Sequence, residues 1–79
     1  MKLNIKYFGK IVEHTIVAEE NIEIENEIKL NELESLIQNK YPELKNESFK
    51  IAVNQQFVKS DFILNTDCEI ALLPPFAGG

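Results

Sequence analysis

The sequence predicts an α+β fold in which one main helix covers one face of a mixed five-stranded sheet. Apolar and polar residues alternate in several short segments, the pattern of half-buried strands. One longer segment instead repeats its apolar residues at the spacing of an amphipathic helix. At 79 residues the chain has room for one domain. Because it holds a single cysteine, no internal disulfide can reinforce the core, which regular elements must therefore build efficiently.

The first strand is expected over residues 2–8, where the alternation is clean. Its inward side chains are Leu3, Ile5 and Tyr7. Phe8 then points to the opposite face, and Gly9 ends the strand. We therefore expect Phe8 on the face of the sheet that the main helix does not cover.

A short helix and a second strand are expected next. Residues 11–16 carry apolar side chains at helical spacing, and residues 21–25 alternate again, which predicts a strand antiparallel to the first. Five glutamates lie within residues 19–27. We interpret them as a solvated strand face that discourages edge-to-edge aggregation. A surface for a basic partner is the alternative interpretation.

The main helix is expected over residues 30–41. Its apolar stripe consists of Leu30, Leu33, Leu36, Ile37 and Tyr41. Pro42 prevents the helix from continuing. Because a sheet this small needs a cover for its apolar face, we assign the stripe to the core.

A third and a fourth strand are expected to form a hairpin. A polar connection over residues 43–48 leads into an alternating segment over 49–53. Its inward side chains are Phe49, Ile51 and Val53. Asn54 and Gln55 then predict a tight turn into a short strand over 56–58, since asparagine tolerates positive φ.

The last strand is expected at the centre of the sheet. A turn over residues 65–67 precedes it, and residues 69–73 are apolar on both faces, as in a central strand. The element order is then strand, strand, helix, strand, strand, strand. One helix over a mixed sheet in this order predicts a β-grasp fold of the ubiquitin-like type.

Composition argues against several classes of partner. The net charge of −5 and the pI near 4.8 disfavour nonspecific binding of nucleic acid or of anionic membranes, which both need a basic surface. No apolar run approaches the ~20 residues of a membrane helix. The first residues do not resemble a signal peptide, and the cysteine is unpaired, so we expect a cytoplasmic protein.

The side chains that could perform chemistry are few. His14 and Cys68 are the only histidine and cysteine, and no metal-binding, phosphate-binding or dinucleotide-binding motif surrounds them. Cys68 shares the inward face of the last strand, and its neighbours Asp67 and Glu69 disfavour the thiolate. Nothing in the sequence marks His14 as functional. We expect no bound metal, no bound cofactor and no self-contained enzyme.

The strongest functional signal lies in the last residues. We divide the chain into a domain over residues 1–73 and an extended, flexible tail over 74–79. Pro74 and Pro75 stiffen the exit from the last strand. Gly78 and Gly79 lack side chains and can enter a channel too narrow for a β-carbon. A stiff stalk with a slim carboxylate tip suits delivery of that carboxylate into another protein's active site, whereas a functionless frayed end is the alternative.

The chain resembles the small, sulfur-carrying subunit of molybdopterin synthase, in the ubiquitin-like MoaD/ThiS group that also includes the thiamine sulfur carrier. The resemblance covers nearly the whole chain. It rests on Tyr7-Phe8, on Leu33 through Tyr41-Pro42-Glu43-Leu44, on Ala52-Val53-Asn54-Gln55 and on Glu69-Ile70-Ala71-Leu72-Leu73-Pro74-Pro75-Phe76-Ala77-Gly78-Gly79. The proline pair favours the molybdopterin synthase subunit over the thiamine carrier. Phe76 departs from the pattern, because a smaller valine is usual there.

This resemblance implies a carrier rather than a catalyst. An E1-like activating enzyme would use ATP and magnesium to adenylate the Gly79 carboxylate, and a sulfur donor would convert it to a thiocarboxylate. Gly79, preceded by Gly78, would then enter the large synthase subunit and donate sulfur to cyclic pyranopterin monophosphate. The alternatives are a thiocarboxylate carrier for thiamine or tRNA thiolation, and a ubiquitin-like modifier of target proteins.

The partner-binding residues are expected around the tail. If the first and last strands are neighbours, Phe8 lies on one face with Ala71 and Leu73, and Phe57 joins them from the fourth strand. A minor second core is the alternative for this apolar group. Together with the tail, the expected partner-binding residues are Phe8, Phe57, Leu73, Pro74, Pro75, Phe76 and Ala77.

Overall fold

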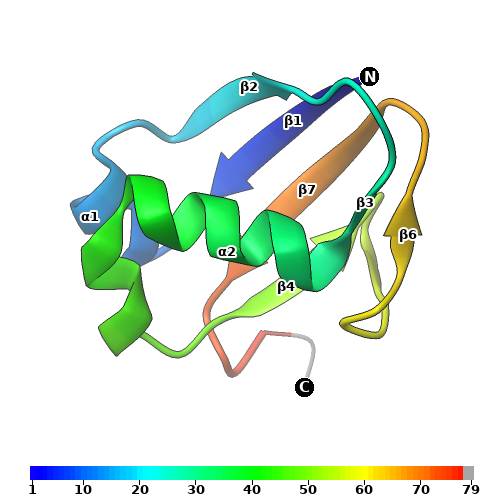
Figure 1. Ribbon diagram of the computed structural model, residues 1–79. Coiled ribbons are helices and arrows are strands. Elements are labelled where there is room, and N and C mark those ends of the chain that lie inside the picture. Colours follow the sequence, from blue (N-terminus) through cyan, green and yellow to red (C-terminus); the bar gives the residue numbers. More distant parts are fainter. Residues whose placement is uncertain (78–79) are drawn as a thin grey trace.

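The computed structural model describes residues 1–77 and shows a mixed five-stranded sheet crossed on one face by a long helix (Figure 1). The strands are β1 (Lys2–Tyr7), β2 (Glu19–Glu23), β4 (Lys50–Val53), β5 (Gln56–Phe57) and β7 (Cys68–Leu73), in the order β2-β1-β7-β4-β5. β1 and β7 run parallel, and the other neighbours run antiparallel. The helix is α2 (Leu30–Lys40). The predicted β-grasp fold is confirmed, with the last strand at the centre of the sheet.

The core lies between α2 and the side of the sheet that faces it. The predicted alternation of β1 is confirmed, since its three inward side chains are buried. Across from them, α2 buries Leu30, Leu33 and Ile37. Leu36, which the sequence analysis assigned to the core stripe, is instead 46% exposed. At about 100° per residue it lies at the edge of the stripe, beyond the reach of the sheet.

Several predicted local features are confirmed. A short helix, α1 (Ile11–Thr15), follows β1, and Ile11 and Thr15 are its buried residues. Asn54 and Gln55 both have positive φ, 48° and 68°, as the predicted turn between β4 and β5 requires. β2, however, begins two residues earlier than predicted, which places the Glu20 side chain on the helix side of the sheet.

Three elements have no counterpart in the prediction. β3 (Ile28–Lys29) and β6 (Ile63–Leu64) form a separate two-stranded sheet, and a 3-10 helix, η1 (Pro42–Asn46), replaces the predicted polar connection. Leu44 in η1 and Leu64 in β6 are buried. Two-residue strands and a five-residue helix are too short to produce a recognisable periodicity, so the pattern does not mark Leu44 or Leu64 as buried.

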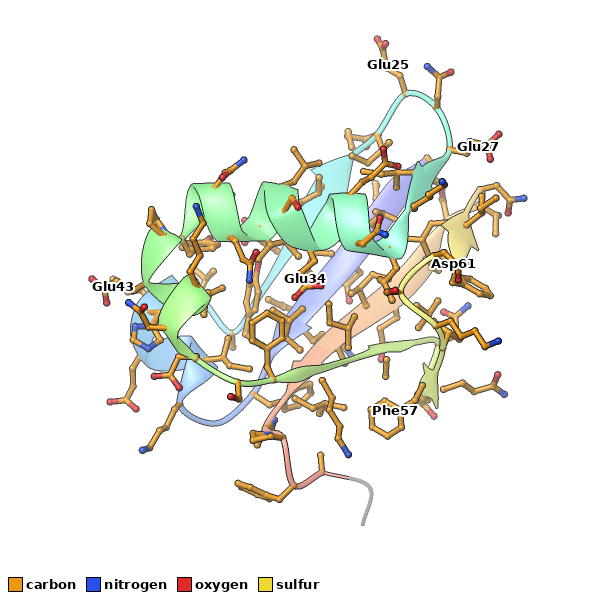
Figure 2. All side chains as sticks on the ribbon, turned by 60° about the horizontal axis from the view of Figure 1, so that its bottom comes forward. Glu25, Glu27, Glu34, Glu43, Phe57 and Asp61 are labelled. Carbon is orange, nitrogen blue, oxygen red and sulfur yellow. The ribbon has the colours of Figure 1, made fainter. Side chains whose placement is uncertain are left out.

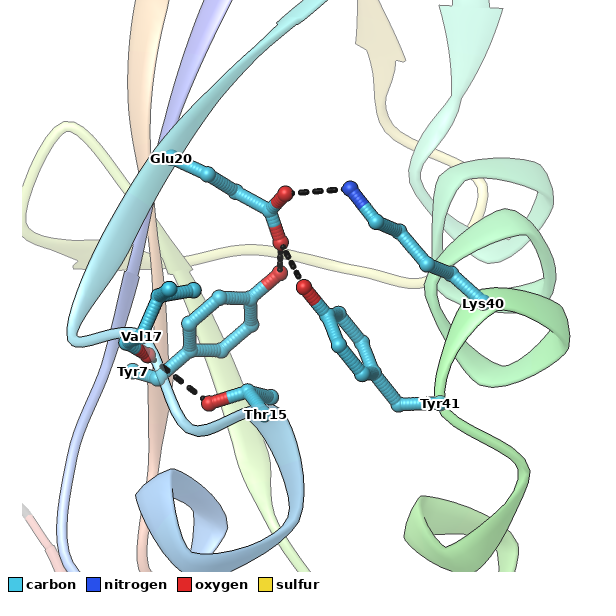
Figure 3. A network of polar contacts seen from close by, with 6 residues as sticks. All are labelled: Tyr7, Thr15, Val17, Glu20, Lys40 and Tyr41. Atoms are coloured by element: carbon cyan, nitrogen blue, oxygen red, sulfur yellow. Dashed lines mark hydrogen bonds and ion pairs between the residues drawn. The ribbon is translucent and has the colours of Figure 1, made fainter.

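A polar network fixes the end of α2 to the sheet (Figure 3). One Glu20 carboxylate oxygen accepts hydrogen bonds from the hydroxyl groups of Tyr7, at 2.5 Å, and Tyr41, at 2.7 Å, and Lys40 pairs with the other oxygen. Burial alone would raise the pKa of Glu20, but these hydrogen bonds outweigh it and hold the pKa below its usual value. Burial and the same carboxylate raise the pKa of Tyr7. The network joins β1, β2 and α2 around one ionised carboxylate.

No helix within residues 1–77 combines the length and the apolar character that crossing a membrane requires.

Candidate functional site

The tail leaves the sheet from its central strand. β7 lies between β1 and β4, so both neighbours flank its last residues. The Phe8 amide donates to the Leu72 carbonyl at 3.1 Å, and Lys50 lies opposite Leu73 in the register of β4 and β7. The end of β1 and the start of β4 therefore surround the root of the tail (Figure 1).

Gly9 accommodates the first tail residue. Its φ is +62°, which residues with a β-carbon rarely adopt, and a β-carbon built there would lie 3.0 Å from Pro74 Cγ. Both the backbone conformation and the space thus favour glycine. The sequence indicated that Gly9 ends the strand, but the contact between residues 65 positions apart in the sequence left no local signal.

The described part of the tail forms a turn, which corrects the prediction of an extended stalk for these residues. The Ala77 amide donates to the Pro74 carbonyl at 3.0 Å. Proline at the start of such a segment fixes φ near the value that β-turns use and does not by itself enforce extension. Lys50 Nζ donates to the Ala77 carbonyl at 3.3 Å and so contacts the end of this turn. Gly78 and Gly79, to which the sulfur chemistry was assigned, lie outside the described residues.

Three apolar side chains form what we call the tail-root patch, namely Phe8, Phe57 and Leu73. The register pairs Tyr7 with Leu72, so its continuation places Phe8 beside Leu73 on the uncovered face. Phe8 is 42% exposed and Phe57 is 51% exposed, which is more than a second core would leave accessible. In Figure 2 the Phe57 ring lies on the side of the molecule from which the tail leaves. The geometry fits the predicted partner surface, and the partner-binding role stays a prediction.

Two further residues determine how much apolar surface is accessible around the tail-root patch. Ala71 shares the uncovered face but is buried, so it supports the patch from beneath and offers no contact area. Phe76 in the tail is 77% exposed and extends the accessible apolar surface beyond the sheet. Exposed aromatic side chains of this kind are typical of binding surfaces.

A groove of about 500 Å³ lies beside the tail. Residues 9–11, 46–48 and 74–76 line it, so it separates the tail from the segment that joins η1 to β4. Glu47 in its wall pairs with His14 of α1: the His14 Nε2 atom lies 3.0 Å from Glu47 Oε1, and its Nδ1 atom lies 2.9 Å from Glu43 Oε2. Hydrogen bonds with Glu47 and then Glu43 raise the pKa of His14.

The sequence analysis found no role for His14, and the structure shows that it joins α1 to η1. Its partners lie 29 and 33 positions away in the sequence, so no local pattern could have indicated the pairing.

The environment of Cys68 disfavours a chemical role. Cys68 lies beside Leu3 on the inward face and packs against the core, as predicted. Burial and then the Asp67 carboxylate raise the pKa of its thiol, which opposes use as a nucleophile. Within residues 1–77, no group of three or more His, Cys, Asp or Glu residues is placed to hold a metal ion.

Comparisons with known proteins agree over the whole chain. The ThiS family matches residues 5–79. The molybdopterin synthase sulfur carrier subunit of Mycobacterium tuberculosis is 32% identical over 82 residues, covering 100% of this chain and 99% of that protein. A Pyrococcus furiosus protein assigned as molybdopterin converting factor subunit 1 has a TM-score of 0.87 at 26% identity, over 94% of this chain and 97% of that chain.

Two further solved structures bear on partners. The chain is similar to one from the complex of subunits 1 and 2 of the molybdopterin-converting factor of Helicobacter pylori, with a TM-score of 0.71 and 28% identity over 100% of both chains. The small archaeal modifier protein SAMP1 of Haloferax volcanii has a TM-score of 0.81 at 15% identity over 100% of both chains. At that identity the likeness shows the shared fold alone.

Proposed function

The chain belongs to the ThiS family, and from this premise we propose that it is the sulfur carrier subunit of a molybdopterin synthase. The observation that carries the proposal is its end-to-end similarity to a molybdopterin synthase sulfur carrier subunit, at 32% identity. The placement of the tail supports it, since Pro74 emerges from the central strand next to an exposed apolar patch.

The chemistry begins at the carboxylate of Gly79. An E1-like adenylating enzyme, using ATP and magnesium, transfers AMP to this carboxylate and releases pyrophosphate. Hydrosulfide supplied by a sulfur donor then attacks the acyl carbon, AMP leaves, and a thiocarboxylate remains. Adenylation is needed because a free carboxylate has no good leaving group. The proposal includes a cytoplasmic location, where thiols stay reduced.

The thiocarboxylate then acts inside the large subunit. Its sulfur is the nucleophile that attacks a carbon of cyclic pyranopterin monophosphate that carries an oxygen substituent, and the new C–S bond forms as that C–O bond breaks and the oxygen leaves. Hydrolysis of the resulting acyl–sulfur bond then leaves sulfur on the pterin and restores the Gly79 carboxylate. Two carriers serve each pterin, because a dithiolene holds two sulfurs. The groups that bind the pterin and move protons belong to the large subunit. The role of this chain is to present the sulfur, and the tail-root patch is the surface that docks on the large subunit.

Deleting Gly79 tests the role of the tip. The deletion moves the reactive carboxyl group back by about 3.5 Å, one residue of extended chain. Sulfur transfer depends on near-attack geometry and is expected to fall below detection in a synthase reconstituted with the large subunit. The thermal melt should match that of the full-length chain, since Leu72 is the last buried core residue within residues 1–77. Normal turnover by the shortened chain would show that Gly79 does not carry the sulfur.

A further inference from the structure

Lys50 lies where the tail and the tail-root patch meet. It is the first residue of β4, and its register partner is Leu73, the last residue of β7. Its Nζ atom donates to the Ala77 carbonyl at 3.3 Å and also lies 5.5 Å from the centre of the Phe57 ring. One ammonium group therefore contacts both the patch and the end of the turn in the tail.

Other charged groups do not compete for this ammonium within residues 1–77. The ion pairs found there involve Lys6, His14 and Lys40, and Lys50 forms none. A lysine ammonium has three donors on a flexible stem, so it can hold the Ala77 carbonyl while it lies over an aromatic face. Both contacts are exposed, which keeps each of them weak and easily exchanged for water.

We propose that Lys50 is a positioning residue that couples the tail-root patch to the tail. While Phe57 is free, Lys50 holds residues 74–77 in the turn; when a partner covers Phe57, Lys50 is displaced and the turn opens. The displacement follows from solvation, because an apolar surface that covers the ring would bury the ammonium without a counter-charge. The inference rests on the proposed function for the identity of that partner, and on the observed contacts for the coupling itself.

Opening the turn changes how far the tail reaches. The first and fourth Cα atoms of a β-turn lie within about 7 Å of each other, whereas four extended residues span about 10 Å between the same atoms. A tail that lengthens when the patch is covered reaches farther into its partner after docking. Linkage makes this coupling reciprocal. If docking favours the open turn by a given factor, a chain whose turn is open docks more tightly by that same factor.

The experiment measures how fast the Ala77 amide exchanges with water, by NMR on the isolated, full-length, isotope-labelled chain. Lys50→Met removes the donor but keeps a stem of similar length, and it is expected to raise the exchange rate about two- to tenfold, the range that one exposed hydrogen bond supports. Lys50→Arg keeps a donor and should restore the wild-type rate. Lys59→Met is the matched control, because it removes the same charge from an exposed lysine that makes no side-chain hydrogen bond within residues 1–77.

Phe57→Leu tests the coupling to the patch. Lys50 contacts both the Phe57 ring and the Ala77 carbonyl. A faster Ala77 exchange in Phe57→Leu, with no further rise when Phe57→Leu is added to Lys50→Met, therefore shows that the ring acts through Lys50. Unchanged exchange in Lys50→Met, or an equal rise in Lys59→Met, would overturn the positioning role. Unchanged exchange in Phe57→Leu would overturn the coupling. None of these measurements needs ATP, a sulfur donor or the large subunit. Their outcome therefore tests the role of Lys50 independently of the sulfur-carrier function.

Discussion

Gly9 determines where the tail begins. Its positive φ turns the chain away from β1, and the missing β-carbon leaves space for the Pro74 ring. Phe8, directly before it, remains on the uncovered face beside Leu73. Alternation alone was enough to predict the face of Phe8, since side chains in a strand have a period of two. The Gly9–Pro74 contact depends on how β1 and β7 pair, which no local pattern contains.

Phe8→Asp is expected to weaken binding to the large subunit by about two orders of magnitude while the chain stays folded. Burying an aromatic side chain contributes about 1.5–3 kcal/mol, and an unpaired carboxylate in its place adds a further cost. Titration calorimetry with the large subunit measures the loss. Leu36→Asp is the matched control, because Leu36 is equally exposed but lies on α2, and it should bind normally.

Thermal melts complete this test. Ile5 is fully buried, so Ile5→Asp should unfold the chain and lose binding only as a consequence. Phe8→Asp should melt near the wild type. If it melts as poorly as Ile5→Asp, Phe8 belongs to the core and the docking assignment is wrong.

At the scale of elements, polar side chains add specific connections between segments that also share the apolar core. Glu20 ties α2 to the sheet, and His14 ties α1 to η1 beside the groove along the tail. Periodicity predicted α1 and α2, whereas η1 and these connections were not predictable from it. Each depends on a partner between 20 and 33 positions away in the sequence.

The His14 pairing predicts a specific pH dependence. The pKa of His14 is raised in the folded chain, so its contribution to stability is fully present below the unfolded value, about 6.5, and is lost as pH rises through the folded pKa. Melting temperatures measured from pH 5.5 to 9 should therefore decline on the alkaline side by more in the wild type than in His14→Gln.

Glu13→Gln serves as the control for a charge change on the same helix that leaves the His14 partners Glu43 and Glu47 in place. Parallel pH curves for the wild type and His14→Gln would contradict the pairing.

At the scale of the whole molecule, strand alternation and one amphipathic helix were sufficient to predict the β-grasp architecture. The apolar character of β7 on both faces predicted its central position, because only a strand with neighbours on each side buries Ile70, Ala71 and Leu72 together. The turn at residues 74–77 was not predicted, because proline fits both an extended segment and a turn, and Lys50, which contacts its end, lies 27 positions away in the sequence. The sequence was therefore sufficient to predict where the candidate site lies. The structure was needed to show the conformation of the tail.

The central claim is that Gly79 carries sulfur, and the intact mass of the protein purified from its native host tests it most directly. Replacing one oxygen by sulfur raises the mass by about 16 Da, and the account predicts this form in cells grown with ample sulfur. Treatment with an alkylating reagent should then add its mass to the thiocarboxylate in a Cys68→Ala variant, where no thiol competes. Finding the tail only as unmodified carboxylate or as conjugates to lysines of other proteins, with no sulfur form, would contradict the account.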